Sequence, residues 1–317
     1  MGLKDLGEFG LIGSIRAGFP APEGIQGIGD DCAVIPQESG SETLVSTDML
    51  VEGSHFLMDD ISPYQLGWKS AAVNFSDIAA MGGSPVGSFL AFALPKSLPD
   101  AWVEGFMEGY RAISTEYGFP LLGGDTTSSP DRLCICVTVL GKAAAGSSRK
   151  RSSARPGDLI CVTGPLGSSG GGLEVILKGL PRDEAAQHLV ERHYLPRPRM
   201  DEGRRLAACD GVHAMMDISD GIGSDLRHIL EESGVGAAVD VRSIPMEQEL
   251  TDICGRHGLD PVWMATCGGE DYELLFTVDP ATEQALDVPH SVIGHITEEQ
   301  GLRWEGADKD YLGFRHF

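Results

Sequence analysis

The sequence predicts an α/β protein of two domains, and three observations support this fold class. Its 317 residues suffice for two domains of ordinary size. Hydrophobic residues make up 42% of the chain, which is normal for a globular protein with a buried core. Short strand-like apolar runs alternate with helical segments on both sides of a small, polar and basic stretch, Ala143 to Asp158. That stretch is either a domain linker or a long exposed loop.

We therefore predict an N-terminal domain over residues 1–142, a linker over 143–156 and a C-terminal domain over 157–317. The first helix has the clearest boundaries. Ser62 suits an N-cap, Pro63 suits the first helical position and Gln65 completes a capping box. We expect this helix to end at Met81, because Gly82-Gly83 can adopt the left-handed conformation that stops a helix.

The other elements follow from apolar periodicity. A second helix is predicted from Asp100 to Tyr117, ending at Gly118. The predicted strands are Thr43–Ser46, Val86–Phe92 and Leu133–Leu140 before the basic stretch, and Leu159–Thr163, Ala214–Ile218 and Leu274–Val278 after it. Helices are predicted near Gly172–Leu177, Asp201–Cys209 and Ser224–Glu232.

Composition limits the function. The formal net charge of −23 argues against nucleic acid and anionic membranes as partners, because phosphate polymers would be repelled. No apolar run approaches the roughly 18 residues that span a bilayer, and we expect no signal peptide, because the first residues carry charges and lack its apolar core. The seven cysteines are an odd number in mostly apolar surroundings, as expected of reduced thiols. We predict a cytoplasmic location.

Aspartates recur in turns and at predicted strand ends. In GIGDDCAVI, Asp31 follows a glycine turn and precedes an apolar run. In VSTDML, a strand is predicted to end at Ser46-Thr47-Asp48, where Ser46 and Asp48 share one face. Hydroxyl and carboxylate oxygens are the ligands that Mg²⁺ prefers. Each motif alone is also typical of an ordinary surface turn. His55 follows Asp48 by seven residues, and a lone histidine is more often structural than functional.

Asp77 is the most unusual of these aspartates. It lies four residues after Val73 and four before Met81, on the apolar stripe of the first predicted helix. A carboxylate on a core-facing stripe is costly unless it is paired or binds a cation. We therefore favour a functional role over a partly exposed position near the helix end.

Three further motifs place acidic residues beside glycines. LLGGDTTSS is predicted as a turn in which Gly124 frees backbone amides for phosphate and Asp125 holds a metal. In MMDISDGIGSDL, Asp217 and Ser219 share a strand face and Asp220 opens the next turn. CGGEDYELLF presents Glu270 and its neighbour Asp271 before an apolar strand. Six acidic motifs in one chain predict phosphate chemistry through divalent cations.

The familiar nucleotide-binding motifs are absent from the sequence. It contains no G-x-x-x-x-G-K-[ST] P-loop and no protein-kinase HRD or DFG motif. The glycine-rich run Gly164–Leu177 follows a predicted strand and enters a helix. A helix N-terminus of this kind could approach phosphate, although the run lacks the lysine of a P-loop.

Taken in order, the motifs resemble those of the thiamine-monophosphate kinase family, within the superfamily of aminoimidazole-ribonucleotide synthetase. The resemblance covers essentially the whole chain. It rests on GEFGLI, GIGDDCAVI, STDMLVEGSHF, KSAAVNFSDIAAMGG, GGDTTSS, ARPGDLICVTG, DISDGIGSDL, GGEDYELLF and the terminal GFRHF. In the last of these, Arg315 stands where the family more often has an acid.

The resemblance implies a two-domain synthetase-like fold of α+β type, with a mixed N-terminal sheet that pairs with a second subunit and a C-terminal α/β domain that completes the site. It implies ATP-dependent phosphorylation of thiamine monophosphate to thiamine diphosphate in a homodimer, by in-line transfer with several Mg²⁺ ions. The implied catalytic residues are Asp48, Asp217 and Arg151. The implied metal ligands are Asp31, Ser46, Thr47, Asp48, Asp77, Asp125, Asp217 and Asp220. The nucleotide is expected at Gly124, Asp125, Arg151 and Ser219, and thiamine monophosphate at His55, Glu270 and Phe314.

Two alternative functions stay open at this stage. One is another ATP-using enzyme of the same superfamily with a different phosphate or carboxylate substrate, which would keep the metal aspartates and change the region of His55, Glu270 and the C-terminus. The other is a non-catalytic nucleotide-binding protein, in which one or more of the metal aspartates would be lost.

Overall fold

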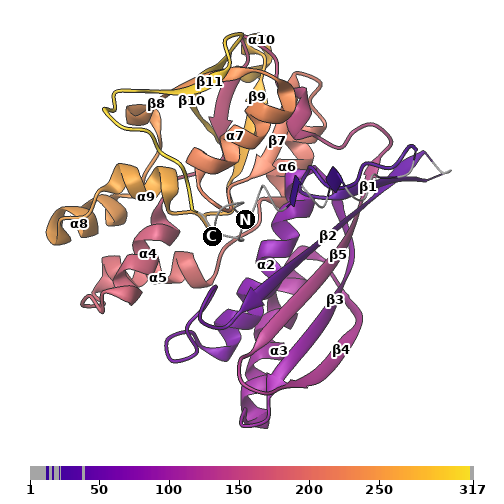
Figure 1. Ribbon diagram of the computed structural model, residues 1–317, viewed down its shortest axis with the longest axis vertical. Helices are drawn as coiled ribbons and strands as arrows, with labels where there is room; N and C mark the ends of the chain where they lie inside the picture. The colour runs from indigo at the N-terminus through magenta and orange to yellow at the C-terminus, as the bar shows by residue number, and fades with distance from the viewer. Residues whose placement is uncertain (1–11, 14–15, 18–20, 22, 38–39, 315–317) are drawn as a thin grey trace.

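The computed structural model describes residues 12–13, 16–17, 21, 23–37 and 40–314. Two mixed sheets, each with its own helices, make up the molecule (Figure 1). The first is built from residues 33–144 and the second from residues 159–305. The two-domain α/β prediction is confirmed. The motif GEFGLI, except Ile12, and the residues Arg315–Phe317 lie outside the described residues.

The N-terminal sheet has the strand order β1-β2-β5-β3-β4. All neighbouring strands are antiparallel except β3 and β4. Helices α2 and α3 lie against one face of this sheet (Figure 1). The elements are β1 (Ala33–Gln37), β2 (Ser41–Val51), α2 (Pro63–Ala80), β3 (Ser84–Pro95), α3 (Asp100–Tyr117), β4 (Leu121–Ser129) and β5 (Cys134–Ala144).

Helix α2 has the predicted ends. The Ser62 hydroxyl accepts a hydrogen bond from the Gln65 amide, and the Gln65 side chain accepts one from the Ser62 amide. At the other end Gly82 adopts a φ of 67°, the left-handed conformation expected of the stop. Helix α3 likewise ends at Gly118 in the left-handed conformation. Local capping interactions thus determine where both helices that pack on the sheet end.

The C-terminal sheet has the order β11-β8-β10-β6-β9-β7, in which only the β8–β11 pair is parallel. Its strands are β6 (Leu159–Val162), β7 (Val212–Asp217), β8 (Gly236–Asp240), β9 (Leu274–Val278), β10 (Ser291–Thr297) and β11 (Gly301–Glu305). Its helices are η1 (Arg151–Ser153), α4 (Ser168–Leu177), α5 (Glu184–Tyr194), α6 (Met200–Ala207), α7 (Ile222–Ser233), η2 (Val241–Ser243), α8 (Gln248–His257), α9 (Pro261–Cys267) and α10 (Pro280–Glu283).

Helix α2 is packed on both sides, by its own sheet and by the C-terminal domain. The Trp68 indole donates a 2.7 Å hydrogen bond to the carbonyl of Pro196. Gly203 of α6 lies so close that a Cβ there would be 2.2 Å from the Ala79 carbonyl oxygen. One hydrophobic core continues from the first sheet through α2 into α5 and α6. Side chains of α2 therefore reach the boundary between the domains.

Two sequence predictions about strands are wrong. Strand β2 does not end at Asp48 but continues to Val51, because Met49-Leu50-Val51 extends the pairing with β5. The LLGGDTTSS motif is not a turn but the edge strand β4, paired in parallel with β3. Its glycines suggested a turn, yet Gly124 serves close approach to the neighbouring strand, since a Cβ there would be 1.8 Å from the Leu90 carbonyl oxygen.

The basic segment between the sheets is anchored by hydrogen bonds. Arg149 donates from Nη2 to the carbonyls of Ala207 and Cys209, at the end of α6. The carbonyl of Arg151 accepts a 2.7 Å hydrogen bond from the Ser233 hydroxyl. This segment is therefore held against the C-terminal domain. None of the helices in the described ranges has the length and apolar character needed to cross a bilayer.

Candidate active site

A cavity of about 510 Å³ lies between the two domains. Both domains contribute acidic, aromatic and aliphatic side chains to its wall. It brings together eight of the residues expected to bind metal, nucleotide or substrate, namely Asp48, Asp77, Asp217, Ser219, Asp220, His55, Glu270 and Phe314. Residues from five separate motifs thus meet in one place.

Three carboxylates form a cluster beside this cavity. Asp31, Asp77 and Asp217 each offer one oxygen, and these oxygens lie within 4.8 Å of one another. Asp31 precedes β1, Asp77 is near the end of α2, and Asp217 ends β7. One oxygen of Asp31, Oδ2, is buried without a hydrogen-bond partner. Converging carboxylates with an unpartnered buried oxygen fit a hard divalent cation such as Mg²⁺.

Ser46 and Asp48 extend the cluster from strand β2. They alternate with Thr47 and so share the face that meets α2. The Ser46 hydroxyl donates a 2.5 Å hydrogen bond to Asp77 Oδ2. The backbone amide of Asp48 donates to the Asn74 side chain at 3.1 Å, which ties this strand to α2.

Burial and mutual repulsion raise the pKa values of these carboxyl groups. Burial, followed by the charge of Asp31, raises the pKa of Asp48 to about 6. The same two causes raise the pKa of Asp217 to about 8. The pKa of Asp77 is also raised, by burial and then by Asp48. Without a cation the site therefore resists full ionisation, and a bound divalent cation would remove this penalty.

Arg151 supplies a positive charge at the cluster. Burial raises the pKa of Asp31, while the guanidinium of Arg151, ion-paired to Asp31 Oδ1, opposes that rise. The Arg151 amide donates a 2.8 Å hydrogen bond to Asp30 Oδ1, which fixes the start of η1. Its Nε is buried without a partner. The predicted phosphate-binding arginine thus lies at the carboxylate cluster and keeps unused hydrogen-bonding capacity.

The turn after β7 brings Ser219 and Asp220 to the cavity. Gly221, with a φ of 91°, allows the chain to turn into α7. The Asp220 amide donates to Asp225 Oδ2 at 3.2 Å, and the Asp220 carbonyl accepts a 2.9 Å hydrogen bond from the Phe314 amide. The second contact holds the C-terminal tail beside the acidic turn.

The residues expected at the substrate, His55 and Glu270, lie near each other in the cavity wall. His55 Nδ1 accepts a 3.0 Å hydrogen bond from the Val51 amide, so a neutral ring carries its proton on Nε2. Burial alone would raise the pKa of Glu270, but the charge of Lys69 holds it below its usual value. Glu270 is therefore an ionised carboxylate in the cavity wall.

Sequence reasoning missed Lys69, which is fully buried and contacts Glu270, and also missed His193. A signal for Lys69 existed, because Lys69, Val73, Asp77 and Met81 follow one another at four-residue spacing on the same helix face. It also missed an apolar wall of the cavity, formed by Leu173, Ile176 and Leu177 of α4 with Tyr194 and Tyr272.

Two predicted metal ligands do not join the cluster within one chain. The Thr47 hydroxyl donates to the Val137 carbonyl at 3.0 Å and points to the other face of the sheet. Asp125 lies on that same face, because Asp125, Ala91, Cys136 and Met49 stand opposite one another across four strands. Neighbouring strands are about 4.8 Å apart, so β4 is some 14 Å from β2.

The glycine-rich run does not offer a free helix N-terminus. The carboxylate of Asp271 accepts hydrogen bonds from the amides of Gly167, at 2.7 Å, and Ser169, at 3.2 Å. These amides at the start of α4 are the donors that a phosphate would use. The suggestion that this run approaches phosphate is therefore wrong, because the Asp271 carboxylate already accepts the hydrogen bonds that a phosphate would accept.

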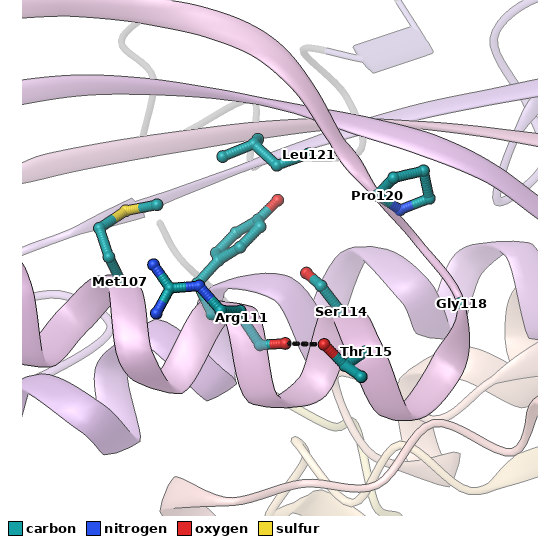
Figure 2. A pocket seen from close by; sticks show the side chains of 8 residues that line it. Met107, Arg111, Ser114, Thr115, Gly118, Pro120 and Leu121 are labelled. Atoms are coloured by element: carbon teal, nitrogen blue, oxygen red, sulfur yellow. Dashed lines mark hydrogen bonds between the residues drawn. The ribbon is translucent and has the colours of Figure 1, made fainter.

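A second cavity of about 430 Å³ lies between α3 and β4. Figure 2 shows Met107, Arg111 and Ser114 on α3 facing Leu121, the first residue of β4, and Pro120 just before it. The Thr115 hydroxyl donates a 2.8 Å hydrogen bond to the Arg111 carbonyl, whereas the buried Ser114 hydroxyl has no hydrogen-bond partner. Gly124 and Asp125 follow on the same strand.

Comparison with known proteins agrees with this geometry. Residues 29–143 match the family "AIR synthase related protein, N-terminal domain" and residues 155–305 the corresponding C-terminal domain. The chain is 40% identical to a thiamine-monophosphate kinase of Salmonella typhimurium, over 98% of each chain.

Solved structures give the same result. A structure described as AaThiL complexed with AMPPCP and TMP superposes with a TM-score of 0.92 at 34% identity, over 100% of this chain and 99% of that one. The thiamine-monophosphate kinase of Stenotrophomonas maltophilia has a TM-score of 0.79 at 36% identity, over 94% and 96% of the two chains.

Proposed function

The chain belongs to the thiamine-monophosphate kinase family, and we propose that it transfers the γ-phosphoryl group of ATP directly to thiamine monophosphate, with several Mg²⁺ ions at its aspartates. The products are ADP and thiamine diphosphate. The observation that carries this proposal is the single cavity in which the aspartates of both domains meet His55 and Glu270.

The main obstacle to this reaction is repulsion between two anions, the acceptor phosphate and the triphosphate of ATP. Mg²⁺ at the aspartates would neutralise both and stabilise the charge of the transition state. Asp31, Asp77 and Asp217 would hold the ions, with Asp48, Ser46 and Asp220 completing their coordination. The aspartates themselves cannot touch phosphate, and their converging geometry sets where donor and acceptor meet.

The transfer itself needs no strong base. An oxygen of the acceptor phosphate is already ionised and attacks the γ-phosphorus, while the bond to the β–γ bridging oxygen breaks and ADP leaves. Arg151 would place its guanidinium on the phosphates of ATP, and the turn at Ser219 would position them. The apolar wall from α4 limits water at the acceptor end.

We propose that Arg151 exchanges its ion pair with Asp31 for the phosphates of ATP when metal ions bind. Arg151→Ala is expected to lower kcat/KM for ATP about a hundredfold, in the range of lost charge-assisted contacts to a transition state. Steady-state kinetics with varied ATP measures this. The matched control is Arg155→Ala, an exposed arginine of the same segment, which is expected to leave the kinetics unchanged. Unchanged ATP affinity and turnover in Arg151→Ala would contradict this role.

The enzyme is proposed to act as a homodimer whose N-terminal sheets face each other. Helices cover one face of the sheet, whereas the other carries exposed apolar side chains such as Met49, Phe89 and Leu122, with no described segment packed over them. Apolar residues on an open sheet face favour association. Asp125 lies on this face, so we propose that it reaches the cluster of the partner subunit.

Mixed dimers test this arrangement. Asp125→Asn and Asp217→Asn are each expected to be inactive as homodimers. In a dimer of one chain of each kind, one site regains both aspartates if Asp125 acts across the interface. Differently tagged chains, co-expressed and doubly purified, are then expected to recover about half of the wild-type activity per dimer, since one of the two sites is intact. Inactive mixed dimers would mean that Asp125 acts within its own chain.

The nucleotide base is proposed to lie in the cavity between α3 and β4. That cavity adjoins the strand that carries Gly124 and Asp125, and its size suits a purine ring. The unpartnered Ser114 hydroxyl offers a hydrogen bond to the base.

A cytoplasmic location is also proposed. All seven cysteines are free thiols, as expected in a reducing compartment.

An assay of the purified protein with ATP, Mg²⁺ and thiamine monophosphate tests the activity. Equal amounts of ADP and thiamine diphosphate are expected, and omission of Mg²⁺ or addition of chelator should abolish both. ADP formed without thiamine diphosphate would favour another substrate, and nucleotide binding without turnover would favour a non-catalytic protein.

A further inference from the structure

We propose that Lys69 is a positioning residue for the acceptor substrate. Lys69 lies outside the cavity and fixes the carboxylate of Glu270, which lines the cavity. The proposal rests on the function above, because it assigns how the chain recognises thiamine monophosphate. Lys69 belongs to α2 in the N-terminal domain, whereas Glu270 belongs to the C-terminal domain. Their contact therefore joins the two domains at the substrate end of the cavity.

The contacts of Lys69 are directed at one carboxylate. Its Nζ lies 2.9 Å from Glu270 Oε1 and 3.0 Å from Oε2. The Lys69 side chain is 0% exposed, whereas that of Glu270 is 27% exposed and lines the cavity. Lys69 itself does not line the cavity. The lysine thus contacts Glu270 from the protein side and leaves the opposite side of the carboxylate for a ligand.

His193 of α5 completes the support. Its Nε2 lies 3.4 Å from Lys69 Nζ and its Nδ1 lies 3.0 Å from the Ser169 hydroxyl. The ammonium can only donate, so Nε2 accepts and the ring is neutral. Burial and then Lys69 lower the pKa of His193 to about 3, in agreement with a neutral ring. Lys69 is accordingly the cation that balances Glu270 on this side.

The backbone at Glu270 is also fixed in an unusual conformation. Glu270 and Tyr272 have φ angles of 55° and 51°, and no other non-glycine residue in the described part of the chain has a positive φ. The Glu270 amide donates a 2.7 Å hydrogen bond to the Ser219 carbonyl. Strained backbone of this kind persists where the surrounding structure holds a side chain for function. Ser219 fixes the Glu270 backbone, and Lys69 fixes its carboxylate.

Stability alone gives no reason to keep this ion pair. Well-packed hydrophobic residues of similar size are often as stabilising as a buried ion pair. A cationic or hydrogen-bond-donating heterocycle, in contrast, needs an ionised acceptor in a fixed orientation. The thiazolium and aminopyrimidine rings of the acceptor offer those groups. The arrangement is therefore explained by recognition of the substrate heterocycle.

The first test is Lys69→Met, which keeps an unbranched side chain shorter by one atom and removes the charge. The KM and Kd for thiamine monophosphate are expected to rise about 10- to 100-fold, as for a lost charged contact. The KM for ATP and kcat at saturating substrate should stay within about twofold, because Lys69 lies about two helical turns from Asp77 of the carboxylate cluster. Lys309→Met, which removes an exposed lysine paired with Asp260, is the matched control and should leave every constant unchanged.

The second test compares Glu270→Gln with the double variant Lys69→Met/Glu270→Gln. If Lys69 acts through Glu270, both bind thiamine monophosphate equally weakly, since the second change removes nothing more. This comparison holds even where Lys69→Met alone folds poorly, because the double variant buries no unpaired charge. A further tenfold loss in the double variant, or unchanged affinity in a folded Lys69→Met, would overturn the proposal. A wild-type protein that does not bind thiamine monophosphate would refute the function instead.

Discussion

Replacing Asp217 with asparagine is expected to lower kcat by about a thousandfold or more and, at pH 8, to stabilise the metal-free protein. The activity falls because an amide oxygen is a poor substitute for a carboxylate as a Mg²⁺ ligand, and the transition state loses its charge neutralisation. The stability rises because asparagine removes a buried group that is costly to ionise.

The direction in which pH changes the stability of the metal-free protein follows from proton linkage. The pKa of Asp217 is about 8 in the folded protein, above its ordinary value of 3.8, so the folded state binds more protons between these values. The contribution of Asp217 to the free energy of unfolding is favourable below the pKa of its carboxyl group in the unfolded chain. It is lost as the pH rises through the pKa of the folded protein. Asp48, with a folded pKa of about 6, acts in the same direction. Metal-free wild type should therefore lose stability from about pH 4 to pH 8.

Thermal unfolding between pH 5 and pH 8, with Mg²⁺ and with chelator, measures these effects. Mg²⁺ should raise the Tm of the wild type more at pH 8 than at pH 5, and should raise that of Asp217→Asn far less. Asp287→Asn is the control, since Asp287 is 99% exposed and should show neither effect. Wild-type turnover in Asp217→Asn, or a lower Tm for its metal-free form at pH 8, would refute the role of Asp217.

Replacing Gly124 with alanine is expected to destabilise the protein by about 3 kcal/mol and to abolish ATP binding. A Cβ at this position would lie 1.8 Å from the Leu90 carbonyl oxygen, and the φ of 155° is itself unfavourable for alanine. Neither backbone can yield without breaking the β3–β4 pairing. The strand that carries Asp125 would then separate from the sheet.

The neighbouring glycine is a close control. A Cβ at Gly123 would meet only the Phe89 ring, at 3.4 Å, so Gly123→Ala should change stability by less than about 1 kcal/mol. Chemical denaturation gives the stabilities and calorimetric titration gives the ATP affinities. Equal stability of the two variants would contradict the close backbone contact at Gly124.

The sequence predicts best what local chemistry determines. Ser62, Gln65 and Gly118 fix helix ends through capping bonds and a left-handed φ, and both helices have the predicted boundaries to within a residue. The buried position of Asp77 followed from helical periodicity. Strand β9 was predicted with its observed boundaries, because a fully apolar run between polar turns is a clear strand signal.

Long-range pairing explains the failures. Strand β4 is made of polar residues and glycines, and it is a strand only because β3 pairs with it. Strands β8, β10 and β11 were not predicted either, since their pairing joins residues from Gly236 to Glu305. The contact of Lys69 with Glu270 joins two domains and cannot be read from either motif alone. The register of four strands decides on which face of the sheet Asp125 lies.

The most direct test of the account is the position of the metal ions in a complex with Mn²⁺, a non-hydrolysable ATP analogue and thiamine monophosphate. Anomalous scattering from Mn²⁺ locates each ion without reference to the surrounding density. Peaks are expected about 2 Å from the carboxylate oxygens of Asp31, Asp77 and Asp217, with Arg151 turned from Asp31 to the phosphates. Density for both ligands without metal at these three carboxylates, and with Arg151 still paired to Asp31, would contradict it.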